Sequence, residues 1–168
     1  MTAPQGLAQL FQYKRWANQE LLALGAASQG ALPADDYRLF VRILNHTYVV
    51  DRIFASHLQG LPQTTYQATN TEETPELATL SEAVRVSDDW YVQYVGGLDD
   101  AQLAEPVAFR FTDGDTGRMS RSEILNHLVV HGTYHRGAAG RILAAHAVQP
   151  PRDSLTTFLH RLEPDRRW

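Results

Sequence analysis

The chain of 168 residues contains no cysteine, which excludes disulfide bonds, thiolate metal ligands and a cysteine nucleophile. It has no run of about 18 or more consecutive apolar residues, so we expect no membrane-spanning segment. The first residues, MTAPQGLAQLFQYKRW, lack the basic start and apolar stretch of a signal peptide. These three absences predict a cytoplasmic protein with no membrane partner.

Positive charge is also scarce, because 15 lysines and arginines face 19 aspartates and glutamates, and the formal net charge is -4. Proteins that bind nucleic acids usually carry a basic patch or stripe. The basic clusters here are short: Lys14-Arg15 and the terminal Asp165-Arg166-Arg167-Trp168. We interpret both as solvated surface, and we therefore expect no nucleic-acid partner.

The composition of the chain is that of an ordinary globular protein, with 43% hydrophobic and 20% charged residues. A chain of this length can bury a core without disulfides. We expect a single domain over residues 1–168.

Hydrophobic periodicity predicts four long helices, over about residues 6–28, 35–58, 75–95 and 120–146. The apolar stripe of the first has Lys14 as its one polar member and otherwise comprises Leu7, Leu10, Ala17, Leu21 and Leu24. The stripe of the second comprises Leu39, Ile43, His46, Val50, Ile53 and His57, so two histidines should face the core. The buried side of the third comprises Leu77, Leu80, Val84, Tyr91 and Val95.

The segments between these helices complete the predicted fold. Residues 61–74 are polar and long enough to cross over along a bundle instead of making a tight turn. Within residues 106–119, large apolar residues alternate with other residues and a turn-rich segment follows. This pattern predicts a small β-hairpin or an extended loop. Thr74-Pro75-Glu76 predicts the start of the third helix, and Ser120 with Glu123 has capping-box spacing for the fourth. The tail, 153–168, should be a short helix or an ordered strap. The predicted fold class is all-α, a four-helix bundle.

Three of the seven histidines, His127, His131 and His135, follow one another at a spacing of four on the last long helix. Imidazoles one turn apart can share a metal ion. His127 and His135 are about 12 Å apart along the axis, so one ion cannot easily bind both. The spacing leaves two pairs open, 127 with 131 or 131 with 135. His46 is the best third ligand.

The other histidines and the alternative chemistries give weaker signals. His57 lies about three turns from His46 and should not reach the same ion, and we interpret His57, His146 and His160 as satisfied core residues. The zincin motif His-Glu-x-x-His is absent, as are the Glu-x-x-His pairs of di-iron bundles and a serine nucleophile elbow.

Three stretches resemble the DinB/YfiT-like superfamily of metal-dependent helical bundle proteins. Residues 10–22 (LFQYKRWANQELL) are similar to its first helix, and Ile43-Leu44-Asn45-His46 is similar to the segment that carries its first ligand. Residues 126–137 (NHLVVHGTYHRG) are similar to its last-helix motif. One departure is Ala138, where the family often has glutamine.

The resemblance implies a four-helix bundle with a metal near one end, often a homodimer. By position, it implies His46, His131 and His135 as the ligands, and so decides against His127. Related branches transfer a low-molecular-weight thiol, such as bacillithiol, mycothiol or glutathione, to an electrophile.

Our expectation is therefore a metal-dependent enzyme of thiol S-transferase type, with zinc as the first choice of metal and nickel or iron as alternatives. Three histidines leave room for water, thiol or substrate. His127, Tyr134 and Arg136 are pocket candidates, and the simpler interpretation of Tyr134 and Arg136 is surface packing. Two other functions stay open: a non-catalytic dimerisation or binding module, and a metal-dependent hydrolase.

Overall fold

A computed structural model describes residues 2–63 and 65–166, which are mostly helical with one small antiparallel sheet. The long helices are α1 (Ala3–Ala27), α2 (Ala34–Leu58), α3 (Leu77–Gly96) and α5 (Arg121–Ala145). The short ones are α4 (Asp100–Ala104) and α6 (Leu155–Leu162), with single 3-10 turns at Gln29–Ala31 and Pro164–Arg166. The strands are β1 (Pro106–Arg110) and β2 (Thr116–Ser120). The predicted hairpin and tail helix are therefore present.

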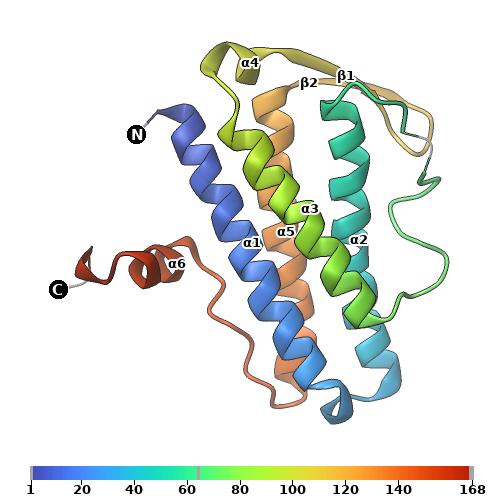
Figure 1. The fold of residues 1–168 in the computed structure, drawn as a ribbon. Coiled ribbons are helices and arrows are strands. Elements are labelled where there is room, and N and C mark those ends of the chain that lie inside the picture. The colour runs from blue at the N-terminus through green and yellow to red at the C-terminus, as the bar shows by residue number, and fades with distance from the viewer. Residues whose placement is uncertain (1, 64, 167–168) are drawn as a thin grey trace.

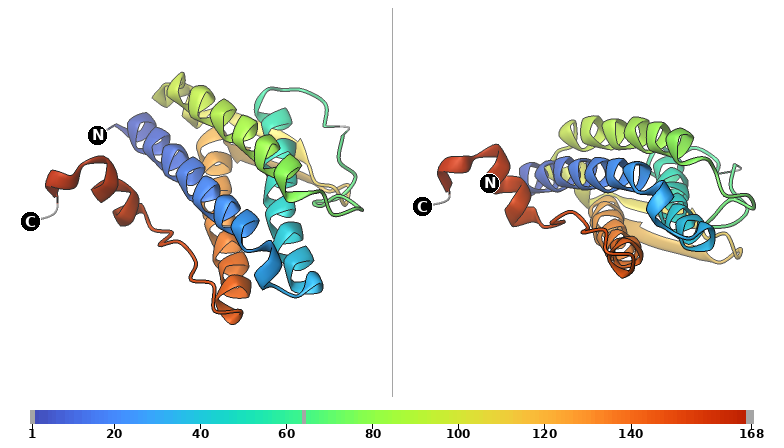
Figure 2. Two further views of the ribbon diagram at one scale, coloured as in Figure 1. Left: turned by 60° about the horizontal axis from the view of Figure 1, so that its bottom comes forward. Right: turned by 90° about the horizontal axis from the view of Figure 1, so that it is seen from below.

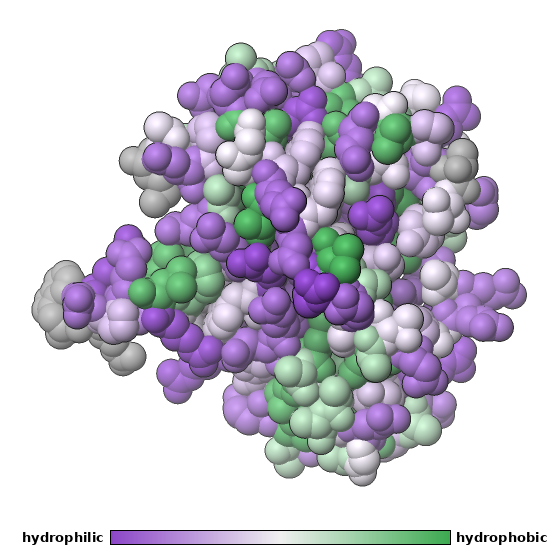
Figure 3. Space-filling view, in the orientation of Figure 1, coloured by the Kyte–Doolittle hydropathy of each residue, from purple (hydrophilic) through white to green (hydrophobic). Residues whose placement is uncertain are grey.

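The four long helices lie side by side (Figures 1 and 2), and each packs against two of the others. α1 contacts α3 and α5, and α2 contacts α5 and α3. The described parts of the long connection between α2 and α3, residues 59–63 and 65–76, run outside the helices. The sheet covers one end of the helices, and α6 projects beside α1, where apolar residues gather on it (Figure 3).

Local capping explains where most helices begin. Thr2, Asp99 and Ser120 each form a capping box, with Gln5, Gln102 and Glu123 respectively. α3 begins two residues later than predicted, and its first residue follows Glu76, which makes no side-chain cap. Thr74 instead accepts a hydrogen bond from the Arg38 side chain at 3.3 Å, so its hydroxyl tethers the connection to α2.

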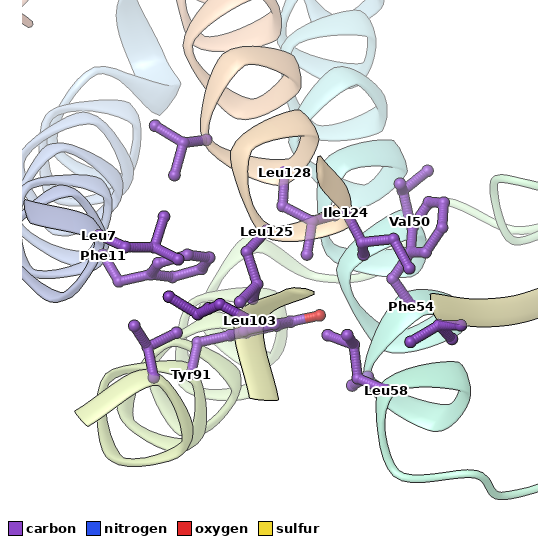
Figure 4. Close-up of a cluster of buried hydrophobic side chains, with 14 of the residues drawn as sticks. Leu7, Phe11, Val50, Phe54, Leu58, Tyr91, Leu103, Ile124, Leu125 and Leu128 are labelled. Carbon is purple, nitrogen blue, oxygen red and sulfur yellow. The ribbon is translucent and has the colours of Figure 1, made fainter. Parts of the chain in front are cut away.

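The core has two large apolar clusters with a polar layer between them, and a small third cluster joins Tyr13 and Ala17 of α1 to Phe158 of α6. One cluster lies under the sheet, where Phe11 and Tyr91 stack close to Leu125 and Phe54 lies on the α2 side of the cluster (Figure 4). The other lies at the far end, around the fully buried Phe40. The polar layer consists of Lys14, Asn18, Asp51, Asp88 and Arg136. Their side chains are hydrogen-bonded in the order Asp51, Lys14, Asp88, Asn18 and Arg136.

The structure corrects two predictions, one from the apolar stripe of α2 and one from the basic cluster Lys14-Arg15. Leu39 is 50% exposed although its stripe placed it in the core, because the buried face of α2 lies at Phe40, Val41 and Leu44 instead. Lys14 is only 1% exposed, so its interpretation as solvated surface is wrong. Arg166 is exposed and pairs with Glu163, while Arg167 and Trp168 lie outside the described residues.

The hairpin is in register from Pro106 opposite Ser120 to Arg110 opposite Thr116. Val107 and Phe109 point into the core and their neighbours point outward, as the alternation predicts. Within the described residues, no helix is long and apolar enough to cross a membrane.

Candidate metal centre

Three histidines from two helices converge on one point between α2 and α5. His46 lies on α2, and His131 and His135 lie one turn apart on α5. One ring nitrogen from each lies within 4.8 Å of the others, and all three side chains are partly buried. Of the two pairs that the spacing left open, the structure therefore brings 131 and 135 together with His46.

The separation of the nitrogens suits a shared ion. The Nε2 atoms of His46 and His131 lie 3.1 Å apart. Two imidazole nitrogens bound to one zinc ion at about 2.1 Å lie about 3.0–3.4 Å apart in octahedral or tetrahedral geometry. The donor set consists of imidazoles alone, which suits zinc, copper, nickel and iron. The residues present thus fit a divalent metal ion.

A backbone carbonyl sets the tautomer of His46. Its Nδ1 lies 2.7 Å from the carbonyl oxygen of Thr69, which can only accept, so Nδ1 carries the proton. The Nε2 atom that faces His131 then has a free lone pair. A hydrogen bond of this kind to the outer ring nitrogen is typical of metal-binding histidines. Sequence reasoning missed Thr69, because the crossover that carries it has no periodicity.

Burial keeps the α5 imidazoles neutral. Burial, followed by the neighbouring histidines and Lys14, lowers the pKa of His131 to about 3. Burial and His46 also lower the pKa of His135. Neutral imidazoles are the form that binds metal. The Nδ1 atom of His131 is buried and has no hydrogen-bond partner among residues 2–63 and 65–166.

The remaining α5 histidine, His127, lies outside the cluster. Its ring is 5.3 Å from that of His131 and 5.6 Å from that of Phe54 on α2. Burial lowers its pKa, although the side chain is exposed on one side. His127 therefore stands between the cluster and an aromatic region under the hairpin.

The other histidines differ from the simple core interpretation. His57 is half-buried, and its Nε2 has no partner among the described residues. His146 lies 2.7 Å from the Asp36 carboxylate and is partly exposed. His160 is exposed. None of the three is a satisfied, fully buried residue.

The two other pocket candidates lie in opposite environments. Tyr134 is 73% exposed, and its ring meets that of His135 edge to face at 5.1 Å. Arg136 is 2% exposed, so it is not part of the surface. Its guanidinium donates to Asp153 at 2.7 Å and to Asn18 at 3.2 Å. Arg136 therefore anchors the C-terminal segment to the polar layer.

The polar layer lies directly behind His131. Lys14 donates to Asp51 at 2.6 Å and to Asp88 at 2.8 Å, and all three side chains are buried. Gly132 allows this approach, because a Cβ there would lie 3.2 Å from Arg136 Nη1 and 3.5 Å from Lys14 Cε. The signal for this layer was a lysine inside an apolar stripe, but its partners lie on other helices.

The model of the DinB family matches residues 1–166 of the chain. The curated Protein DinB of Bacillus subtilis (strain 168) is 26% identical over 172 aligned positions, which cover 92% of this chain and 95% of that protein. Both comparisons therefore span nearly the whole chain.

Proposed function

The chain belongs to the DinB family, and on that premise we propose that His46, His131 and His135 together bind one divalent metal ion. The observation that carries the proposal is the convergence of three ring nitrogens within 4.8 Å from two different helices. The hydrogen bond from His46 to Thr69 supports it, because it frees Nε2 for a ligand bond. The four long helices would then form a four-helix bundle around the centre.

We further propose a metal-dependent enzyme of thiol S-transferase type, with zinc as the resident ion. Three protein ligands leave a coordination position open, as in catalytic zinc sites. An ion held there would lower the pKa of a bound thiol or water and so supply a nucleophile at neutral pH. Because the chain has no cysteine, the thiol must be a cosubstrate.

In such a transfer the thiol loses its S–H proton to solvent, and the sulfur electron pair forms a bond to an electrophilic carbon. The leaving group departs with the electron pair of its bond to that carbon. This chain's own contributions are position and environment. The partly buried cluster limits water, and His127 and Tyr134 border it.

The test of metal binding is the metal content of untagged protein purified without a nickel column. We expect about one ion per chain in the wild type and almost none in His131→Ala or His46→Ala, because two imidazoles bind a divalent ion much more weakly than three. His127→Ala is the matched control, since it removes a histidine from the same helix one turn away. It should keep its metal.

Metal that survives in His131→Ala, or that is lost equally in His127→Ala, would contradict the proposed ligand set. A wild type without stoichiometric metal after incubation with zinc would favour a non-catalytic module. Consumption of glutathione with 1-chloro-2,4-dinitrobenzene, in which chloride leaves, then tests the transferase assignment. Turnover of an activated ester with no thiol dependence would favour a hydrolase instead.

A further inference from the structure

A cavity of about 620 Å³ lies between the hairpin, the end of α2 and the connection that follows it. This volume is in the range of small-molecule sites. Three aromatic rings and one imidazole form much of its wall: Tyr66, Phe109, Phe111 and His57. Arg110 and Gly117 of the hairpin also line it. Gly117 leaves space for the Phe109 ring, because a Cβ there would lie 2.7 Å from it.

The polar groups of this wall favour an anion. No lining residue is acidic, and the Arg110 side chain forms no hydrogen bond or ion pair with any residue in the described part of the chain. The His57 Nε2 is buried without a partner among those same residues. Asp113 lies nearby in the hairpin turn but does not line the cavity, and its carboxylate accepts from the Asp115 backbone N–H at 3.0 Å.

The cavity extends toward the histidine cluster but is not lined by its three histidines. A smaller cavity of about 60 Å³ adjoins it, because both are lined by His57 and Phe109, and the smaller one reaches Thr69, the residue bonded to His46. Aromatic rings follow the same direction: His127 contacts His131, Phe54 contacts His127, and Phe109 contacts Phe54 at centroid distances of 5.3, 5.6 and 5.4 Å.

A compact molecule cannot span the distance from the cavity to the histidine cluster. His57 is eleven residues from His46, which is about 16 Å along the α2 axis. A substrate bound in the large cavity can therefore reach the metal centre only with a second, extended part of the molecule. Binding energy gained by such a non-reacting part can still assist the reaction by holding the reacting part in place.

We propose that the hairpin cavity binds a planar aromatic group with a carboxylate, and that this group is the non-reacting part of the substrate used at the metal centre. The second half of this statement rests on the proposed function, while the first half does not. The aromatic wall supplies apolar contact, and the Arg110 guanidinium supplies donors for the carboxylate.

The test uses 2-naphthoate as the probe and 2-naphthalenemethanol as its neutral counterpart, with affinities measured by calorimetry on the full chain. Arg110→Gln should weaken naphthoate binding about fivefold and leave the alcohol unchanged, because an exposed charge-assisted bond is lost. Phe111→Ala should weaken both probes, because it removes part of the aromatic wall from a side chain that is 47% exposed. The matched control is Arg118→Gln, an exposed arginine on β2 that does not line the cavity.

Equal effects of Arg110→Gln and Arg118→Gln would overturn the proposal, and so would a wild type that does not bind naphthoate. Loss of naphthoate binding in His131→Ala would also overturn it, because the carboxylate would then be a metal ligand. Metal content should stay unchanged in both arginine variants. If no variant holds metal but Arg110 still controls naphthoate binding, the cavity site stands and only its link to a metal reaction falls.

Discussion

Replacing Lys14 with methionine tests whether the polar layer is a true buried ion network. Burial lowers the pKa of Lys14, but Asp51 and Asp88 outweigh this effect and raise it above its ordinary value, so the lysine is charged at neutral pH. Lys14→Met preserves the bulk of the side chain but removes the ammonium group that both buried carboxylates contact directly. Breaking a buried pair in this way costs about 3–5 kcal/mol. That is a large part of the roughly 5–15 kcal/mol by which domains are stable.

The assay is urea unfolding followed by circular dichroism, with Arg15→Met as the matched control. Arg15 is the neighbouring residue and pairs with Asp89 at 3.0 Å, but both side chains are about one-third exposed. Its loss should cost less than about 1 kcal/mol. The two variants remove the same charge from adjacent positions, so the difference between them isolates the effect of burial.

The same pair of variants predicts a pH dependence. Burial raises the pKa of Asp51 to about 6 even with Lys14 beside it. Without Lys14, Asp51 should bind a proton still more readily in the folded state, because the ammonium group that lowers its pKa is gone. A carboxyl whose folded pKa is raised stabilises the fold at low pH, and this contribution is lost as pH rises through the folded pKa. The penalty of Lys14→Met relative to wild type should therefore shrink between pH 8 and pH 5. A penalty no larger than that of Arg15→Met, or one that does not change with pH, would refute the argument.

Two further predictions concern the histidine cluster and a helix contact. Metal-free protein should lose stability as pH falls from about 6.5 toward 3, by up to about 1.4 kcal/mol per pH unit for each proton, because burial places the folded pKa of His131 below its unfolded value. Urea unfolding in a chelator should show this slope, and an equal slope in His131→Gln would contradict it. Gly25→Ala should cost about 1–3 kcal/mol, since its Cβ would lie 2.4 Å from Phe40 Cε1, whereas Gly137→Ala on the open face of α5 should be neutral or stabilising. Similar melting temperatures for the two alanine variants would argue against that close packing.

Features that depend on neighbours in the sequence were predictable from it. The four long helices, the hairpin and the tail helix follow from periodicity, turn residues and caps, each of which acts over a few positions. The Ser120–Glu123 capping box is an example, because both of its partners lie within one turn. The starts of α1 and α3 differed by a few residues, since a helix end is weakly determined by its local residues.

For the candidate site, the spacing alone left two histidine pairs on α5, and the resemblance selected His131 and His135 with His46. The tertiary structure brings that set together because α2 packs against α5 at the level of His46. The same packing places His127 next to Phe54 and away from the cluster. No local pattern could distinguish these outcomes, because they depend on how two helices rotate against each other.

Lys14 shows most clearly what only the tertiary structure decided. Its sequence neighbours are the same whether the ammonium group is solvated or buried. Its partners, Asp51 and Asp88, are 37 and 74 residues away on two other helices. A charge can be buried only where opposite charges and hydrogen bonds replace its water. The sequence determined which faces of the helices are apolar, and the assembly of the helices decided where a charged layer could cross between them.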